Sequence, residues 1–173
     1  YLAKYGLAWM ASNNLAHGTF TLANAGDSFT VDAALTDQAA NPAPGINWDG
    51  KTLTKLGSGT LVLAGKNSYT GDTMISGGTL LVNGSIASSA MTTVAAGATL
   101  GGSGTLGKTK VESDATLAPG GVGTTLTVDG DLTIASGATY QVHADPSSAR
   151  STLVKVTGAA LLEGGTVMHV GPD

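Results

Sequence analysis

The chain has 173 residues, of which 26 are glycine, 5 % are aromatic and 12 % are charged, and its net charge is −4. Because about 25 % charged residues is usual for a soluble globular domain, this composition excludes a thick core of large side chains, while 42 % apolar residues exclude a disordered polar tract. The absence of cysteine excludes thiolate metal sites, a cysteine nucleophile and disulfide bonds.

Charged residues are dispersed along the chain. The closest basic pair, Lys108 and Lys110, makes no basic face for phosphate, so we expect no nucleic-acid partner. No stretch reaches the roughly 18 to 20 apolar residues of a membrane-spanning helix, and Tyr1–Lys4 does not open a signal peptide. Because the sequence starts without Met, we expect it to be a fragment of a longer protein.

The first 50 residues show little periodicity. Thr19–Leu22 and Ser28–Val31 alternate as short strands do, whereas Ala39–Gly45 contains two prolines and predicts a loop. Both tryptophans, Trp9 and Trp48, lie in this part of the chain. We expect them to fill a widened core rather than to line a ligand groove.

The remainder of the chain repeats itself about every 20 residues. Gly59–Leu63 and Gly78–Val82 share a Gly-Thr-Leu start and an alternating apolar tail, in which the first and third apolar residues can point inward. Two interleaved series continue this pattern. The first series contains Thr60, Thr79, Thr99, Thr116, Thr139 and Thr166. The second series begins its strands at Leu53, Thr73, Thr92, Thr109, Leu132 and Leu153.

Period, short strands and glycine-rich corners together predict an all-β fold, a right-handed parallel β-helix with coils of about 20 residues. We expect one continuous solenoid with irregular coils over 1–50 and regular repeat coils over 51–173. Leu61 and Leu80 should then lie one above the other. A single coil buries too little apolar surface to offset the entropy of ordering it. The two ends of the solenoid present unpaired strand edges, so we expect end-to-end association unless the first coils cap one end.

The last strand poses a question of register. Alignment of Gly165–His169 with Gly78–Val82 places the imidazole of His169 inside the solenoid. Because burial of an unpaired polar ring is costly, we expect the last coil to slip by one residue, so that Met168 and Val170 face inward.

One segment carries a more specific pattern. It contains Leu-Thr-Lys at 53–55, Gly-Thr-Leu at 59–61, an Asn-x-Tyr-Thr-Gly turn at 67–71 and a closing Gly-Gly-Thr-Leu at 77–80. In all four features it resembles the passenger-associated repeat of bacterial autotransporters, the AIDA/antigen-43-like β-helix family of type V secretion. Looser similarity covers nearly the whole chain.

The resemblance implies a passenger segment that a Gram-negative bacterium exports through its outer membrane to the cell surface or the medium. Its partner would be the protein's own C-terminal outer-membrane β-barrel. The implied function is a structural stalk that supports outward folding during secretion and displays an adhesin or cargo domain. Two alternatives remain open: an adhesive module that binds a host surface protein or itself, and the support segment of a secreted serine protease.

Catalytic and cofactor motifs are incomplete in this sequence. Ser103 follows two glycines but lacks the second glycine position of a nucleophile elbow, and His143 and Asp145 are neighbours in sequence only. Gly102–Gly107 matches a dinucleotide fingerprint, but the residues after it predict a strand where a helix is needed. We therefore expect no enzyme activity, no catalytic or cofactor-binding residues and no cofactor.

Metal and carbohydrate sites are equally unsupported. The three histidines, His17, His143 and His169, share no metal-ligand spacing, so we expect no metal site. A carbohydrate-active β-helix enzyme is the least favoured alternative, because it needs clustered acids beside basic residues, and the only arginine is Arg150. A binding module would instead use stacked Thr and Ser hydroxyls with outward amides, for which the candidates are Asn67, Asn83 and Gln141.

Overall fold

The computed structural model describes residue 9 and residues 17–171. Within them the chain forms 18 strands and no helix, in three sheets whose ladders are all parallel. The first sheet contains β1 (Thr19–Thr21), β3 (Leu53–Leu56), β5 (Thr73–Ile75), β8 (Thr92–Val94), β11 (Thr109–Val111), β14 (Leu132–Ile134) and β17 (Ala160–Leu162). The second contains β2 (Ser28–Val31), β4 (Thr60–Leu63), β6 (Thr79–Val82), β9 (Thr99–Gly102), β12 (Thr116–Pro119), β15 (Thr139–His143) and β18 (Thr166–Val170). The third contains β7 (Ser85–Ile86), β10 (Thr105–Leu106), β13 (Thr125–Val128) and β16 (Leu153–Val156).

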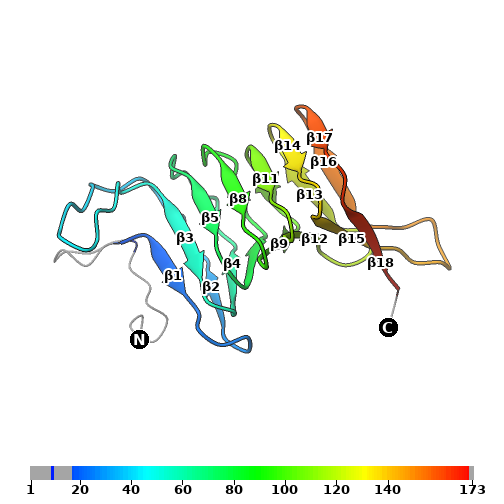
Figure 1. Ribbon diagram of the computed structural model, residues 1–173, viewed down its shortest axis with the longest axis horizontal. Helices are drawn as coiled ribbons and strands as arrows, with labels where there is room; N and C mark the ends of the chain where they lie inside the picture. The colour runs from blue at the N-terminus through cyan, green and yellow to red at the C-terminus, as the bar shows by residue number, and fades with distance from the viewer. Residues whose placement is uncertain (1–8, 10–16, 172–173) are drawn as a thin grey trace.

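The three sheets are the sides of one solenoid. From β5 onward the chain passes from the first sheet to the second and then to the third before it returns to the first, whereas the first two coils contribute strands to the first and second sheets only. Successive coils stack along the long axis of the molecule (Figure 1). This is the predicted right-handed parallel β-helix, and the prediction of the fold class is confirmed. No helix with the length and apolarity of a membrane span occurs in the described residues.

Side chains at equivalent positions of successive coils stack in columns along the axis of the solenoid. Leu61 pairs with Leu80, and Leu80 pairs with Leu100; all three are completely buried, as predicted. Alternation holds within each strand, because β4 and β6 both bury their second and fourth residues and leave the others half-buried. Along these coils the inner face of the second sheet is therefore lined by stacked leucine side chains, one for each coil.

The first series of threonines forms a single outer column on the second sheet. Its members pair in register from strand to strand, and Ser28 extends the column into the first coil. The second series is correct for five of its strands, but the prediction for Leu153–Val156 is wrong. This strand pairs with β13 in the third sheet, and Ala160–Leu162 takes its place in the first sheet.

Glycine makes the tight corners between sheets. Gly78 has φ +60°, and a Cβ there would collide with the carbonyl oxygen of Gly59 in the preceding coil. A side chain at this corner would thus conflict with both the backbone conformation and the layer below.

The first coil is capped by aromatic side chains. Trp9 and Trp48 are 7 % and 6 % exposed, and their ring centroids lie 5.1 Å apart. Trp9 also packs against Phe20 and Tyr69, at centroid distances of 6.3 and 5.1 Å. The tryptophans fill the core, as predicted, and they cover the interior at the N-terminal end.

The last coil keeps the register of the others. Tyr140 pairs with Val167, and Val142 pairs with His169, so the predicted slip of one residue is wrong. A slip would be favoured if this register buried the imidazole without a partner. His169 is exposed in β18, the last strand within the described residues, so its imidazole is not desolvated there.

Candidate functional site: a buried polar spine

Five polar side chains are buried where the second and third coils meet. Lys55, Tyr69 and Thr73 are 0 % exposed, Ser89 is 3 % exposed and Asn67 is 6 % exposed. We call these five residues the polar spine. They come from β3, from β5, and from the turns that precede β5 and β8. Buried polar groups lower stability unless they are hydrogen-bonded, so their partners decide what they contribute.

Lys55 points into the interior because it follows Leu53 by two residues on β3, and alternate residues of a strand share a face. Its neighbours above and below in the column are the apolar Phe20 and Ile75. Burial of the ammonium among these groups lowers the pKa of Lys55 to about 8. A charge in this position needs polar partners at the edge of the core.

Three carbonyl oxygens at the glycine corner supply those partners. The Nζ of Lys55 donates to the carbonyl of Leu56 at 2.8 Å, of Gly57 at 2.9 Å and of Gly77 at 3.2 Å. Gly57 has φ +77°, a left-handed conformation that glycine adopts readily. Since Gly77 belongs to the next coil, the ammonium group ties the corners of two successive layers together.

Asn67 connects three layers. Its Oδ1 accepts a hydrogen bond from the backbone N–H of Leu35 at 2.8 Å, in the first coil. Its Nδ2 donates to the carbonyls of Gly65 and Ser85, both at 3.0 Å, in its own coil and the next. An amide offers both donors and an acceptor on one planar group, and all of these functions are used here. The prediction that Asn67 belongs to an outward ladder is wrong.

Three hydroxyl groups form a directed chain of hydrogen bonds. The Oγ of Ser89 donates to the carbonyl of Gly71 at 2.8 Å. It also lies 2.8 Å from the Oγ1 of Thr73. The Oγ1 of Thr73 in turn lies 2.7 Å from the hydroxyl oxygen of Tyr69. Because the proton of Ser89 is committed to Gly71, Thr73 donates to Ser89 and Tyr69 donates to Thr73. Burial raises the pKa of Tyr69 above its ordinary value, which keeps this donor protonated.

The spine is suited to fixing register rather than to chemistry. Its hydrogen bonds are satisfied only when coils one, two and three stack in this alignment. A shift of one residue would leave buried donors and acceptors unpaired, at a cost of about 1–3 kcal/mol each. The apolar columns alone also oppose a shift of one residue, which would turn each inward side chain outward, but they discriminate less well against a shift of two residues.

The structure does not join the candidate catalytic residues of the sequence. Ser103 is exposed, and its Oγ lies 3.4 Å from the Oδ1 of Asn83. The carboxylate of Asp145 accepts hydrogen bonds from Ser147 and Ser148 within its own hairpin, and donation from Ser147 lowers the pKa of Asp145. The backbone N–H of His143 donates to Thr152.

Metal and nucleotide candidates are likewise separated. His17 lies at the start of the first sheet, whereas His143 and His169 lie in the last two strands of the second sheet. No group of three metal-ligating side chains occurs among the described residues. The Gly102–Gly107 segment leads into the strand β11, as the sequence predicts.

Sequence reasoning missed most of the polar spine. The alternation of Leu53, Thr54 and Lys55 carries the signal for Lys55, because it assigns the lysine to the same face as a buried leucine. No such signal exists for Asn67, whose partners lie 32 and 18 residues away in the chain.

Two comparisons place the spine in a known context. Residues 53–82 match the passenger-associated-transport-repeat family, and this match contains Lys55, Asn67, Tyr69 and Thr73. Over 116 residues, or 66 % of its length, the chain is 39 % identical to an extracellular serine protease of Serratia marcescens. It spans 11 % of that relative's length. Residues 53–82 are thus a passenger-associated transport repeat, and the two matches together support an autotransporter passenger segment that carries it.

Proposed function

We propose that this segment is a structural stalk of an exported passenger, which supports outward folding and holds a cargo domain away from the cell. The observation that carries the proposal is the polar spine, which aligns three coils by hydrogen bonds across layers. The aliphatic columns then continue the same alignment coil by coil. A rod of this kind transmits position and adds stability at each layer, and neither task requires an open active site.

Outward folding is a reasonable task for such a rod. Each coil that emerges from the membrane is unstable alone and becomes stable when it stacks on a folded neighbour. A segment whose register is fixed by specific hydrogen bonds gives later coils a defined layer on which to stack. Freedom from cysteine supports this role, because the unfolded chain cannot form disulfide crosslinks before it is exported.

The relative from Serratia marcescens favours one kind of cargo. It is an extracellular serine protease, and this chain corresponds to about a tenth of it. We propose that a protease domain elsewhere in the same polypeptide is the cargo of this stalk. An adhesive domain is the alternative cargo.

Excision of one complete coil from the full-length protein tests the stalk. Removal of residues 92–108 joins Met91 to Thr109 and should let β11 stack directly on β5, because Thr92 and Thr109 already occupy one column. Removal of residues 92–102 alone leaves a partial coil and breaks that alignment. A stalk should tolerate the first deletion and keep secretion and cargo activity, and it should lose secretion with the second.

The same experiment separates a stalk from an adhesive module. A binding face formed by the outer threonine column would lose adhesion when Thr99 and its layer are removed in register. Loss of secretion with the complete-coil deletion would contradict the stalk, and loss of adhesion with intact secretion would favour the adhesive module.

A further inference from the structure

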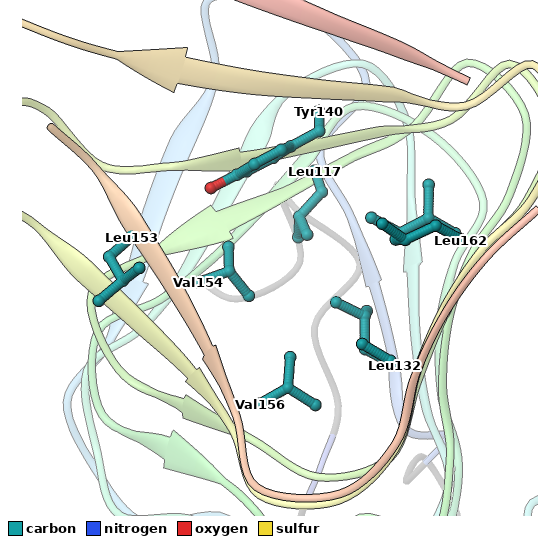
Figure 2. Close-up of a pocket in the computed structure, with 9 residues that line it drawn as sticks. Leu117, Leu132, Tyr140, Leu153, Val154, Val156 and Leu162 are labelled. Carbon is teal, nitrogen blue, oxygen red and sulfur yellow. The ribbon is translucent and has the colours of Figure 1, made fainter. Parts of the chain in front are cut away.

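The interior of the solenoid is chemically inert where it is hollow. A cavity of about 310 Å³ lies in the last described coils, and its lining consists of aliphatic side chains and the ring of Tyr140 (Figure 2). Burial raises the pKa of Tyr140, which keeps its hydroxyl group protonated and unreactive. Groups that can undergo a covalent reaction in water are therefore found at the corners between the sheets, where the backbone reaches the surface.

One corner combines an asparagine with a following glycine. Asn83 and Gly84 connect β6 to β7, and Asn83 is the only asparagine in the sequence that precedes a glycine. In such a pair the backbone nitrogen of the glycine can attack the side-chain amide, because no Cβ hinders its approach. The side chain of Asn83 is exposed, so water reaches it.

The reaction of this pair is a deamidation. The nitrogen of Gly84 loses its proton and bonds to the Cγ of Asn83, while the bond from Cγ to Nδ2 breaks and Nδ2 leaves as ammonia. Water then opens the cyclic imide. Cleavage at Cγ gives aspartate, whereas cleavage at the main-chain carbonyl gives isoaspartate, in which the backbone runs through the side chain. Water is the only co-reactant.

In the folded solenoid the preceding coil holds the nucleophile. The N–H of Gly84 donates to the carbonyl of Leu63 at 3.0 Å, and the N–H of Asn83 donates to the same oxygen, also at 3.0 Å. Leu63 ends β4, one coil earlier. Loss of the Gly84 proton would break a hydrogen bond between two coils, so stacking disfavours the first step of the reaction.

The next coil holds the side chain that is attacked. The Oδ1 of Asn83 accepts hydrogen bonds from the backbone N–H of Ser103 at 3.3 Å and from its Oγ at 3.4 Å. Ser103 lies at the equivalent corner, between β9 and β10. The nucleophile and the amide are thus anchored to different coils, and they can react only when this corner separates from its neighbours.

The corner requires its glycine but not its asparagine. A Cβ at Gly84 would collide with the carbonyl oxygen of Gly65 in the preceding coil, and a Cβ at Gly104 would collide with that of Gly84. Ala64 and Ser103 precede the equivalent glycines, so this place accepts other side chains. The same close approach of the layers leaves no room for the longer main chain of isoaspartate.

Beyond the stalk function, we propose that Asn83 is a deamidation site that is reactive in the unfolded chain and protected by the stacked coils. Isoaspartate adds a methylene group to the main chain where the layers approach most closely, so a chain that stays unfolded gradually loses the ability to form this corner. Once coils two, three and four have stacked, the amide is preserved. The site therefore limits the time that the chain can spend between synthesis and folding.

Mass spectrometry of the full-length protein tests this proposal. The protein is incubated at mildly alkaline pH, either folded or in guanidinium chloride. Trypsin cleavage after Lys66 and Lys108 then releases the fragment 67–108, in which aspartate and isoaspartate at position 83 are measured. The folded protein should react at least about tenfold more slowly, because the reaction has to wait until the corner opens. A short peptide of residues 79–88 gives the rate of the unprotected pair, which the unfolded chain should match.

The matched control is Asn83→Ser, which places the residue of the next coil at this corner. It should abolish the modification and leave the thermal midpoint almost unchanged. After return to native conditions, chains with isoaspartate should remain sensitive to protease, whereas Asn83→Ser should refold after the same incubation. Equal rates in the folded and unfolded protein, an unfolded chain that does not react, or normal refolding of chains with isoaspartate would each overturn the proposal.

Discussion

Lys55 and Gly77 lie in successive coils and are joined by a hydrogen bond of 3.2 Å from the lysine Nζ to the glycine carbonyl. The same ammonium group binds two carbonyls of its own corner. A charged group between the apolar Phe20 and Ile75 of its column thus takes its partners from the backbone of two layers. This relationship explains why a lysine occupies an inward position of the transport repeat.

Replacement of this lysine should destabilise the rod. Lys55→Met keeps much of the side-chain volume but removes the lysine donor from three carbonyl oxygens, of which that of Leu56 still accepts a hydrogen bond from the N–H of Leu22. We expect a loss of about 1–2 kcal/mol in the free energy of unfolding. Urea unfolding followed by circular dichroism measures this loss. Lys66→Met is the matched control, since Lys66 is exposed, and it should change stability by less than about 0.5 kcal/mol. Equal stability of both variants would contradict the role of Lys55.

Lys55 should also make stability depend on alkaline pH. Burial lowers its pKa in the folded protein from 10.5 to about 8, so between these values the unfolded chain binds more protons than the folded chain. The free energy of unfolding should therefore rise with pH across this window, and the effect of Lys55 should be constant below it.

The measurement compares the native chain with Lys55→Met at about pH 7 and about pH 9, where ordinary tyrosines, with a pKa of about 10, remain mostly protonated. The native chain should gain stability relative to the variant at the higher pH. A difference between the two proteins that stays constant, or that shrinks, would show that the folded state does not lower the pKa of Lys55.

Asn67 should tolerate no change of its amide. In Asn67→Asp the two donors of Nδ2 become a carboxylate oxygen that faces the carbonyls of Gly65 and Ser85, so we expect a loss of about 3 kcal/mol or more. Asn83→Asp makes the same chemical change at an exposed position and should cost less than about 0.5 kcal/mol. Chemical denaturation of the two variants gives the comparison, and similar losses would place Asn67 outside the spine.

The same leucine-to-alanine change should have different effects in a middle coil and in the last described coil. Leu100→Ala removes a completely buried side chain and should cost about 2–5 kcal/mol. Leu162→Ala removes one that is 67 % exposed, and it should cost less than about 1 kcal/mol in dilute protein. Thermal unfolding at low concentration measures both, and a large loss for Leu162→Ala in a monomer would mean that the last coil is covered.

The stacking of Leu61 on Leu80 could be predicted from sequence because it depends on two regular features, the period of the repeat and the alternation of each strand. The third sheet has a weaker signal in the sequence, because its first strands, β7 and β10, are only two residues long. The sequence pattern therefore assigns the longer strand at Leu153–Val156 to the first sheet, whereas it belongs to the third.

Burial was harder to predict where it depends on what lies on the next layer. His169 keeps its inward register without desolvation of its imidazole, because it is exposed in the last strand that the structure describes. Asn67 is buried although asparagine in a turn is usually solvated, since its partners Leu35 and Ser85 come from two other coils. Local patterns determine the strands, whereas these contacts depend on tertiary stacking.

The solenoid depends on the register of one coil on the next, and a disulfide trap measures that register directly. The chain has no cysteine of its own. Val62 and Leu81 are paired on the outer side of adjacent strands, so Val62→Cys with Leu81→Cys should crosslink under mild oxidation. Thr60→Cys with Leu81→Cys is displaced by two residues, beyond the span of a disulfide of about 7 Å between Cα atoms. Thiol titration should show complete loss of free thiols in the first variant and retention in the second; crosslinking of the displaced pair, or of neither, would contradict the stacked solenoid.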